Sequence, residues 1–414
     1  MNQTEYRSAA AQVPRDEPDV SRRRKLRVYL MDLWSFIPYY MADLCSHLAA
    51  ETVEVKLGSA RYHLDRHYFQ KAGLAPDRLL LDAGGGIRSN FLRRLVKSCE
   101  YLANLLLLGV RFLVSRPDIL HVQYLVFLER GLSFEIWFLK WVRLLDIRVV
   151  YTVHNVTRQD APQQGIERFR RAYNAVDALI CHGEQARAEL VRDFGIAQEK
   201  IWVIPHGPLF DDGPQFSPEE ARAKLGLERD QPLVLCLGVI SEYKGIPFLL
   251  DGWKKLKAEG TEGRLLIAGT GDQRVLSEIQ GKVAADSLSS SVSLWLQFVS
   301  VEQLPLLYQA ADILVYPYKA GTTSGALLTG LNYGKAVVAT RLPFFQEYLE
   351  HERTGLLVDY GAADDLAAAL QVLIQQPQQR ARLASALMRE AAQRTGWSEI
   401  ARKTRQCYEA TLAT

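Results

Sequence analysis

The chain has 414 residues, of which 48% are hydrophobic and 23% charged, with a formal net charge of +3. This length predicts two domains, and the composition is that of a globular protein with sizeable cores. The five cysteines are scattered without C-x-x-C spacing, which argues against a disulfide framework or structural zinc and favours a reducing compartment. Uncharged apolar runs such as 101–110 are too short to span a bilayer, and we expect no signal peptide.

Residues 1–25 are polar and aperiodic and end in basic residues, so we expect a disordered basic tail. From residue 26 onward, short apolar segments alternate with helical patterns, which predicts a parallel sheet covered on both faces. We expect an N-terminal, acceptor-side Rossmann-like domain at 26–208. Its strand candidates are 26–30, 53–57, 78–81, 119–122, 148–154, 178–182 and 201–205.

Turn-forming residues crowd the segment 206–218, which is typical of a linker. A second alternating array follows, with strand candidates at 233–237, 264–268, 292–296, 313–316, 336–339 and 355–358. We expect a C-terminal, nucleotide-sugar-binding Rossmann-like domain at 209–395 and a last helix, 396–414, that packs back on the first domain. The predicted fold class is α/β, with two doubly wound domains facing a central cleft at the carboxyl ends of their strands.

The segment 313–340 predicts a strand, a loop of small residues, a helix and another strand. Such a loop points unpaired backbone N–H groups and the positive end of a helix dipole at whatever lies over it. The sequence therefore predicts a phosphate or diphosphate site, although a simple helix cap would give the same pattern. The loop residues are Thr322, Thr323, Ser324 and Gly325.

Other candidate residues follow strands and would face the same cleft. Lys244 stands just before a helix, where its ammonium would neutralise a phosphate, unless it is a solvated surface lysine. His154 ends the strand 148–154 and would bond a polar ligand or transfer protons, unless it is a structural histidine. Gly269 and Gly271 form a glycine turn on the same edge.

Several strings follow one another in an order that is known from one enzyme family. They are RPDILHVQY, VVYTVHNV, VIPHG, LGVISEYKG, LLIAGTGD, LYQAADILVYPY, SGALLTGLNYGKAVVAT and RTGLLVD. Together they resemble the retaining glycosyltransferases of family 4, which have the GT-B fold, from about residue 26 to residue 408. The resemblance implies transfer of a sugar from a nucleotide diphospho-sugar, UDP- or GDP-linked, with retention. We expect no required metal ion, because no D-x-D pair stands in a suitable loop, and no other cofactor.

The resemblance also implies roles for individual residues. Lys244 would hold the donor diphosphate together with the backbone amides of residues 322–325, and His154 would contact the donor sugar near the reacting carbon. Thr329, Gly269 and Gly271 would lie near the donor nucleotide. The acceptor, a lipid-linked saccharide or an oligosaccharide, would lie on the first domain near Trp34, Tyr39 and Arg88.

The sequence departs from the family at three positions. Gly321 and Thr329 stand where the family commonly has two glutamates, and Val239 stands where an arginine often assists the lysine. Exopolysaccharide-type members carry a similar small polar loop. Because the two glutamates are missing, the alternative is a non-catalytic, sugar-nucleotide-binding partner subunit of a glycan assembly complex. An epimerase or a phosphorylase of the same fold fits less well.

The segment 61–116 contains ten Lys or Arg and four Asp or Glu residues, a net charge of +6. Its apolar residues recur at helical spacing, which predicts a basic amphipathic helix suited to the surface of an anionic bilayer. The alternative is a helix packed on a sheet with a solvated basic face. We expect a cytoplasmic protein peripherally associated with the inner membrane surface, and no nucleic acid partner because no binding motif accompanies the charge.

Overall fold

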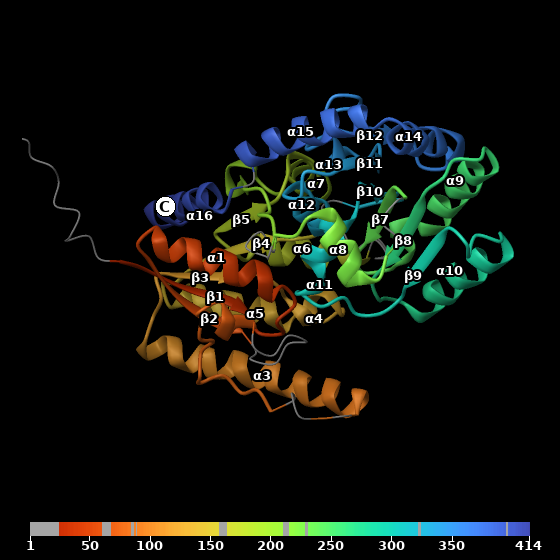
Figure 1. Ribbon diagram of the computed structural model, residues 1–414. Helices are drawn as coiled ribbons and strands as arrows, with labels where there is room; N and C mark the ends of the chain where they lie inside the picture. The colour runs from red at the N-terminus through yellow and green to blue at the C-terminus, as the bar shows by residue number, and fades with distance from the viewer. Residues whose placement is uncertain are drawn as a thin grey trace, which may run out of the picture.

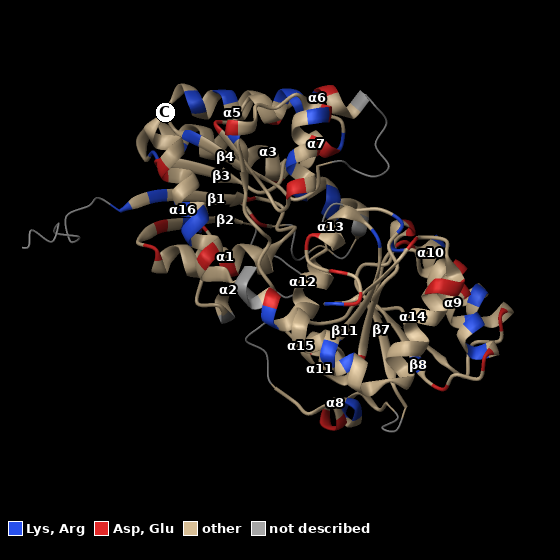
Figure 2. Ribbon diagram, turned by 90° about the horizontal axis from the view of Figure 1, so that it is seen from above, with Lys and Arg blue, Asp and Glu red and all other residues tan. Residues whose placement is uncertain are grey.

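The computed structural model describes residues 25–59, 68–83, 87, 89–156, 164–209, 215–227, 231–321, 324–394 and 396–414. All but the last residue of the expected basic tail therefore lie outside the described residues, as do Arg88, Thr322 and Thr323. The described strands form two six-stranded parallel sheets with helices packed around each, which confirms the expected fold class (Figures 1 and 2).

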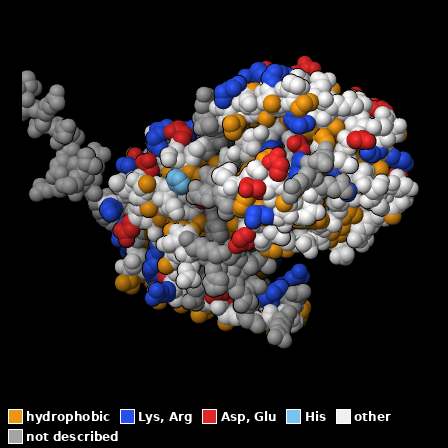
Figure 3. Space-filling model, in the orientation of Figure 1, with side chains coloured by type: hydrophobic (Ala, Val, Ile, Leu, Met, Phe, Trp, Pro, Cys, Tyr) orange, Lys and Arg blue, Asp and Glu red, His pale blue; other side chains and the backbone are white. Residues whose placement is uncertain are grey.

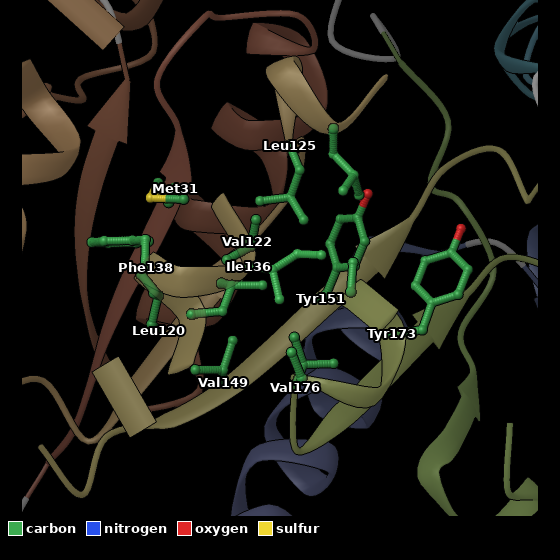
Figure 4. Packing of buried hydrophobic residues seen from close by; sticks show 14 of the residues in the cluster. Met31, Leu120, Val122, Leu125, Ile136, Phe138, Val149, Tyr151, Tyr173 and Val176 are labelled. Atoms are coloured by element: carbon green, nitrogen blue, oxygen red, sulfur yellow. The ribbon is translucent and has the colours of Figure 1, made fainter. Parts of the chain in front are cut away.

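The first sheet has the strand order β2–β1–β3–β4–β5–β6 and is parallel throughout. Its strands are β1 (Leu26–Asp32), β2 (Val53–Ser59), β3 (Ile119–Val122), β4 (Arg148–Val153), β5 (Ala178–Cys181) and β6 (Ile201–Val203). The accompanying helices are α1 (Pro38–Ala50), α2 (Tyr68–Lys71), α3 (Asn90–Val114), α4 (Val126–Glu129), α5 (Phe134–Leu144), α6 (Gln164–Asn174) and α7 (Glu184–Phe194). Because helices cover both faces, the residues of β3, β4 and β5 are almost all buried, whereas the edge strand β2 exposes Glu54 and Lys56. In Figure 4, Ile136 and Phe138 of α5 pack toward Leu120 and Val122 of β3.

The second sheet has the order β12–β11–β10–β7–β8–β9 and is also parallel. Its strands are β7 (Leu233–Leu237), β8 (Arg264–Ala268), β9 (Val292–Trp295), β10 (Ile313–Tyr316), β11 (Ala336–Thr340) and β12 (Leu356–Val358). Its helices are α8 (Pro218–Leu225), α9 (Ile246–Ala258), α10 (Gln273–Ala285), α11 (Gln303–Ala310), α12 (Gly325–Leu331), α13 (Pro343–Gln346), α14 (Ala363–Gln375) and α15 (Pro377–Arg394). A short helical turn, η4 (Glu242–Lys244), precedes α9.

The strand expected at 78–81 is wrong, because these residues form a turn. Leu80 is buried in the core of the first domain, but Leu79 and Leu81 on either side of it are exposed, unlike the residues of a covered strand. The backbone of Leu81 is satisfied by a side chain instead of a neighbouring strand. Its N–H donates to Asn104 Oδ1 at 2.7 Å, and Asn104 Nδ2 donates to its carbonyl at 3.0 Å.

The last helix, α16 (Trp397–Ala413), completes the core of the first domain. Trp397 is buried, packs on Tyr40 of α1 with ring centroids 5.3 Å apart, and donates from Nε1 to the Pro208 carbonyl at 2.7 Å. Gly207 has no side chain because its Cβ would lie 2.3 Å from the indole. Tyr408 reaches His121 on the first sheet, with 2.6 Å between its hydroxyl and Nδ1.

The Trp397→Ala variant is expected to lose about 3–5 kcal/mol of unfolding free energy, the usual cost of truncating a buried aromatic residue. Urea titration followed by circular dichroism measures this loss. The matched control is Leu412→Ala on the same helix, whose side chain is 40% exposed. Equal stability of the two variants would contradict the role given to Trp397.

Candidate active site

Lys244 follows β7 and occupies a tight turn against the loop after β10. The turn ends at Gly245, which has φ +65°, and a Cβ there would lie 2.0 Å from the Pro317 carbonyl oxygen. Lys244 is buried, and its Nζ donates to the Tyr318 hydroxyl and lies 3.8 Å from the Tyr318 ring centroid. The Tyr318 hydroxyl is in turn 3.1 Å from Ser324 Oγ. The three side chains therefore meet at the carboxyl edge of the second sheet.

Within the described part of the chain, no Asp or Glu forms an ion pair with the ammonium of Lys244. The titratable groups that act on it are the weak acids Tyr243 and Cys236. Burial lowers its pKa, because removing an ammonium from water without a counter-ion costs free energy. An anion placed against Nζ would offset that cost.

The start of α12 lies beside this cation. Ser324 is the N-cap, and its Oγ accepts from the Leu327 N–H at 3.2 Å. A Cβ on Gly325 would meet no atom within 4 Å, so open space adjoins the first residue of the helix. Two of the four loop residues predicted for the diphosphate, Ser324 and Gly325, are therefore placed near Lys244. Thr322 and Thr323 lie outside the described residues.

The residues predicted for the donor nucleotide have clear packing roles. Gly269 and Gly271 lie at the carboxyl end of β8, where Cβ atoms would come within 1.9 Å of the Gly238 oxygen and 1.7 Å of the Ile240 oxygen. Close approach of the β7 and β8 loops therefore requires glycine at both positions. Thr329 is buried inside α12. The nucleotide role of all three stays a prediction.

In the first domain, His154 directly follows β4 and both of its ring nitrogens are already engaged. Nε2 is 2.8 Å from the Gln123 side-chain amide, and Nδ1 is 3.0 Å from His182 Nε2. Its ring stacks on Tyr124, with centroids 5.2 Å apart and 6° between the planes. The His154 side chain is only 7% exposed.

The donor and acceptor roles in this row of hydrogen bonds follow from the backbone carbonyl at which it ends. His182 Nδ1 donates to the Ile204 carbonyl at 3.1 Å, so in the neutral ring Nε2 must accept from His154 Nδ1. His154 Nε2 is then an acceptor, which requires the amide nitrogen of Gln123, rather than its oxygen, to face it. A ligand hydroxyl that donates to His154 must therefore displace Gln123.

Further histidines occupy the same strand-end position and were not selected from the sequence. His182 follows β5 and His206 follows β6, and Tyr40 packs against both rings at centroid distances of 5.8 and 4.7 Å. Each is an isolated histidine at the end of an apolar strand, which is the signal that selected His154. We call four residues the buried histidines: His121, His154, His182 and His206.

Three aromatic side chains form a shelf beside His154. Trp34 stacks on Phe36 with centroids 6.3 Å apart, and Phe36 lies 5.0 Å from Tyr124. The Arg130 guanidinium lies 4.5 Å from the Trp34 ring centroid, and Lys97 Nζ lies 5.6 Å from it. We call Trp34, Phe36 and Tyr124 the aromatic shelf. Of the other residues predicted for the acceptor side, Tyr39 is half-buried in α1 and Arg88 lies outside the described residues.

The two domains meet at Glu347, directly after α13. Its Oε1 accepts from the Gln185 N–H at 2.9 Å, so a carboxylate of the second domain caps α7 of the first. Gly183, the N-cap of α7, has no side chain of its own to offer, and a Cβ there would lie 2.2 Å from Glu347 Oε2. A groove of about 300 Å³ between the domains is lined by His182, Pro205, Glu347, Tyr348 and Lys403, among others.

Two doubly wound domains with a groove between them define the GT-B class of proteins. The model of glycosyltransferase family 4 matches residues 37–207, and the model of glycosyl transferases group 1 matches residues 217–388. The chain therefore belongs to the GT-B glycosyltransferases of group 1, with a family 4 type N-terminal domain. Among the described residues, no group of three or more His, Cys, Asp and Glu side chains is arranged to hold a metal ion.

Two relatives and one solved structure are similar to this chain. A D-inositol 3-phosphate glycosyltransferase from Pseudarthrobacter chlorophenolicus is 27% identical over 319 residues, 72% of each chain. An alpha-monoglucosyldiacylglycerol synthase from Streptococcus pneumoniae is 26% identical over 272 residues, 63% of this chain and 60% of that protein. Anabaena HepE in complex with UDP and glucose shares the fold, with a TM-score of 0.73, 15% identity, and coverage of 93% of this chain and 100% of that chain.

Acidification is expected to lower the stability of the first domain. Burial lowers the pKa of all the buried histidines, to about 3 for His182 and about 4 for His206. Such groups stabilise the fold above their unfolded pKa of about 6.5, and each loses about 1.4 kcal/mol per pH unit below it. Asp32 and Glu135 act oppositely, because burial raises their pKa to about 6 and about 7. The four histidines together lose more free energy of unfolding on acidification than the two carboxyl groups gain.

Urea titration at neutral pH and at about pH 5.5 measures this difference in the free energy of unfolding. We expect the lower value at the lower pH. Equal values at both would show that the histidines are charged in the folded protein or that their burial is compensated. The control is the Trp397→Ala variant, which should lose the same amount at both pH values because Trp397 does not titrate.

Proposed function

We propose that the protein transfers a sugar from a nucleotide diphospho-sugar, UDP- or GDP-linked, to a saccharide acceptor, with retention of anomeric configuration and without a metal ion. The observation that carries the proposal is the buried ammonium of Lys244, which has no carboxylate partner among the described residues and lies beside Ser324 and the open start of α12. A diphosphate supplies the missing negative charge. UDP in complex with the structurally similar Anabaena protein supports a nucleotide diphosphate as the ligand.

The reaction proposed for this site places negative charge on the leaving diphosphate. The Lys244 ammonium and the backbone N–H groups at the start of α12 would stabilise that charge, and the burial of Lys244 strengthens its attraction for an anion. The acceptor hydroxyl attacks from the face that the leaving group vacates and passes its proton to the departing diphosphate oxygen. His154 orients the donor sugar, which requires the Gln123 amide to exchange its hydrogen bond with a sugar hydroxyl.

The acceptor is proposed to lie against the aromatic shelf, since aromatic faces stack on the apolar faces of sugar rings and Phe36 is 45% exposed. Arg130 and Lys97 would bind an acceptor phosphate there. We propose that this acceptor is a lipid-linked saccharide at the cytoplasmic face of the inner membrane. The name of the S. pneumoniae relative, a glucosyldiacylglycerol synthase, supports a lipid acceptor.

A second candidate function is a sugar-nucleotide-binding subunit without catalysis. It is favoured by Gly321 and Thr329, which provide no carboxylate where the family commonly has glutamates. It predicts nucleotide binding with neither transfer nor hydrolysis of the donor. Incubating the protein with radiolabelled UDP- and GDP-sugars and a lipid extract separates the two functions.

The Lys244→Ala variant is expected to lose nucleotide binding by about 2–5 kcal/mol, the usual cost of removing one partner of a buried charge pair. A thermal-shift screen with UDP, GDP and their sugars measures this loss. The matched control is Lys254→Ala, an exposed lysine of α9 paired with Asp286 on the surface. A Lys244→Ala protein that binds these nucleotides as the wild type does would refute the site.

The Phe36→Ala variant is expected to raise the KM for the acceptor about tenfold and leave the KM for the donor unchanged, because losing a stacked aromatic face costs about 1–1.5 kcal/mol. Initial rates with one substrate varied at a time measure both values. An equal rise in the two KM values would mean that Phe36 supports the fold of the site rather than the acceptor.

A further inference from the structure

Helix α3 has two apolar faces on opposite sides. Tyr101, Leu105, Leu108 and Phe112 are buried in the core of the first domain. The other side exposes large apolar side chains: Phe91, Leu92, Leu95, Leu102, Leu106, Leu107, Val110, Leu113 and Val114, with Phe91 79% and Val114 90% exposed. The exposed side of α3 is thus largely apolar, which differs from the solvated basic face of the alternative expectation. The expectation of a helix suited to a bilayer surface stays a prediction.

The exposed residues of α3 lie in one stripe. Phe91, Leu95, Leu102, Leu106 and Leu113 are separated by four or seven residues, which places them on the same side of a helix. Figure 1 shows α3 along the lower side of the molecule. In Figure 3, hydrophobic and basic side chains lie together along this lower edge.

Helix α5 extends the exposed apolar surface. Trp137 is 70% exposed, Trp141 42% and Leu144 80%, at spacings of four and three residues. Trp141 Nε1 donates to the Gly109 carbonyl of α3 at 3.2 Å, so its indole rests on the neighbouring helix. We call the exposed apolar residues of the two helices the α3–α5 face.

A patch of this extent on a globular protein marks an interaction surface. No helix of the described residues is long and apolar enough to cross a membrane, so the α3–α5 face fits a surface on which it lies flat. The two tryptophans fit that geometry, because an indole has an apolar body and a polar N–H and collects at the level of lipid headgroups.

The border of the α3–α5 face is basic. Helix α3 carries Arg93 and Arg94 near its start, whereas Lys97 lies over the Trp34 ring and Arg111 pairs with the buried Asp77. At α5, Lys140 Nζ lies 5.5 Å from the Trp137 ring centroid. A groove of about 410 Å³ beside it is lined by Lys140 and by Arg143 and Arg148, both of which pair with Asp177. Apolar side chains bordered by cations complement an anionic lipid surface. Two copies joined symmetrically through this face would instead bring the basic borders together.

We propose that the α3–α5 face is the surface by which the protein lies on an anionic phospholipid bilayer, with α3 in the plane of the membrane and Trp137 and Trp141 at headgroup level. This binding does not depend on the transfer reaction.

The aromatic shelf adjoins this surface. The ring of Trp34 lies 6.2 Å from Tyr101, on the buried side of α3. Docking through the opposite side of the helix holds the shelf about one helix diameter, roughly 10 Å, above the bilayer. A lipid-linked saccharide could therefore reach the shelf without leaving the membrane.

The test is flotation of the full-length protein with vesicles of phosphatidylcholine alone or with added phosphatidylglycerol. The wild type is expected to float with the anionic vesicles and to dissociate at high salt. The double variant Leu106→Glu with Trp137→Glu is expected to lose at least about tenfold in partitioning, because it puts two carboxylates on the apolar face. Both side chains are exposed, at 73% and 70%, so the fold should tolerate the change.

The matched control is Met388→Glu, an exposed apolar residue of α15 on the second domain, which should float like the wild type. Flotation of the double variant like the wild type, or no flotation of the wild type with either vesicle, overturns the proposal. A wild-type dimer that the double variant converts to monomers overturns it too, in favour of a protein interface. Thermal shifts of both variants with UDP and GDP test the donor site separately. Loss of nucleotide binding is thereby distinguished from loss of membrane binding.

Discussion

The site in the second domain depends on one constraint, the burial of a lysine ammonium without a neighbouring carboxylate. Tyr318 holds Lys244 through its hydroxyl and its ring face, which positions the cation without neutralising it. The same hydroxyl reaches Ser324, so the cation and the start of α12 are held together. A carboxylate at this place would stabilise the empty protein but would compete with an anionic ligand. In the proposed function, an anionic ligand would offset the free energy that burying this ammonium costs the fold.

In the first domain, by contrast, the buried polar groups form hydrogen bonds with one another. The chain from Tyr408 through His121, Gln123, His154 and His182 ends at a backbone carbonyl, and each group can be satisfied with neutral rings. A network that is complete fixes the positions of its members. The contrast separates the roles of the two domains: one offers an uncompensated charge, and the other offers a rigid wall with aromatic surfaces.

Much of the fold follows from local sequence patterns, but the partners of the site residues do not. Continuous apolar runs with helices between them predict buried parallel strands, and residues after such strands, Lys244 and Ser324 among them, are expected at one edge. The segment 78–81 misled because an apolar run does not reveal that Asn104 replaces a neighbouring strand. The link from His154 to His182 joins residues 28 positions apart, and single-sequence spacing carries no information on such pairs. The spacing of apolar residues along α3 does not show which side of the helix packs on the core and which side stays exposed.

Helix α16 follows the second domain in the sequence but packs on the first, which has a consequence for folding during synthesis. Trp397 and Tyr408 belong to the core of the first domain, yet they are synthesised after the whole of the second domain. Domains usually fold in order as the chain emerges from the ribosome, but the core of this first domain closes only after α16 has been made. Until then the surfaces of Tyr40 and His121 that α16 covers are exposed to water. Nascent chains paused within the second domain are therefore natural clients for chaperones that hold unfinished domains.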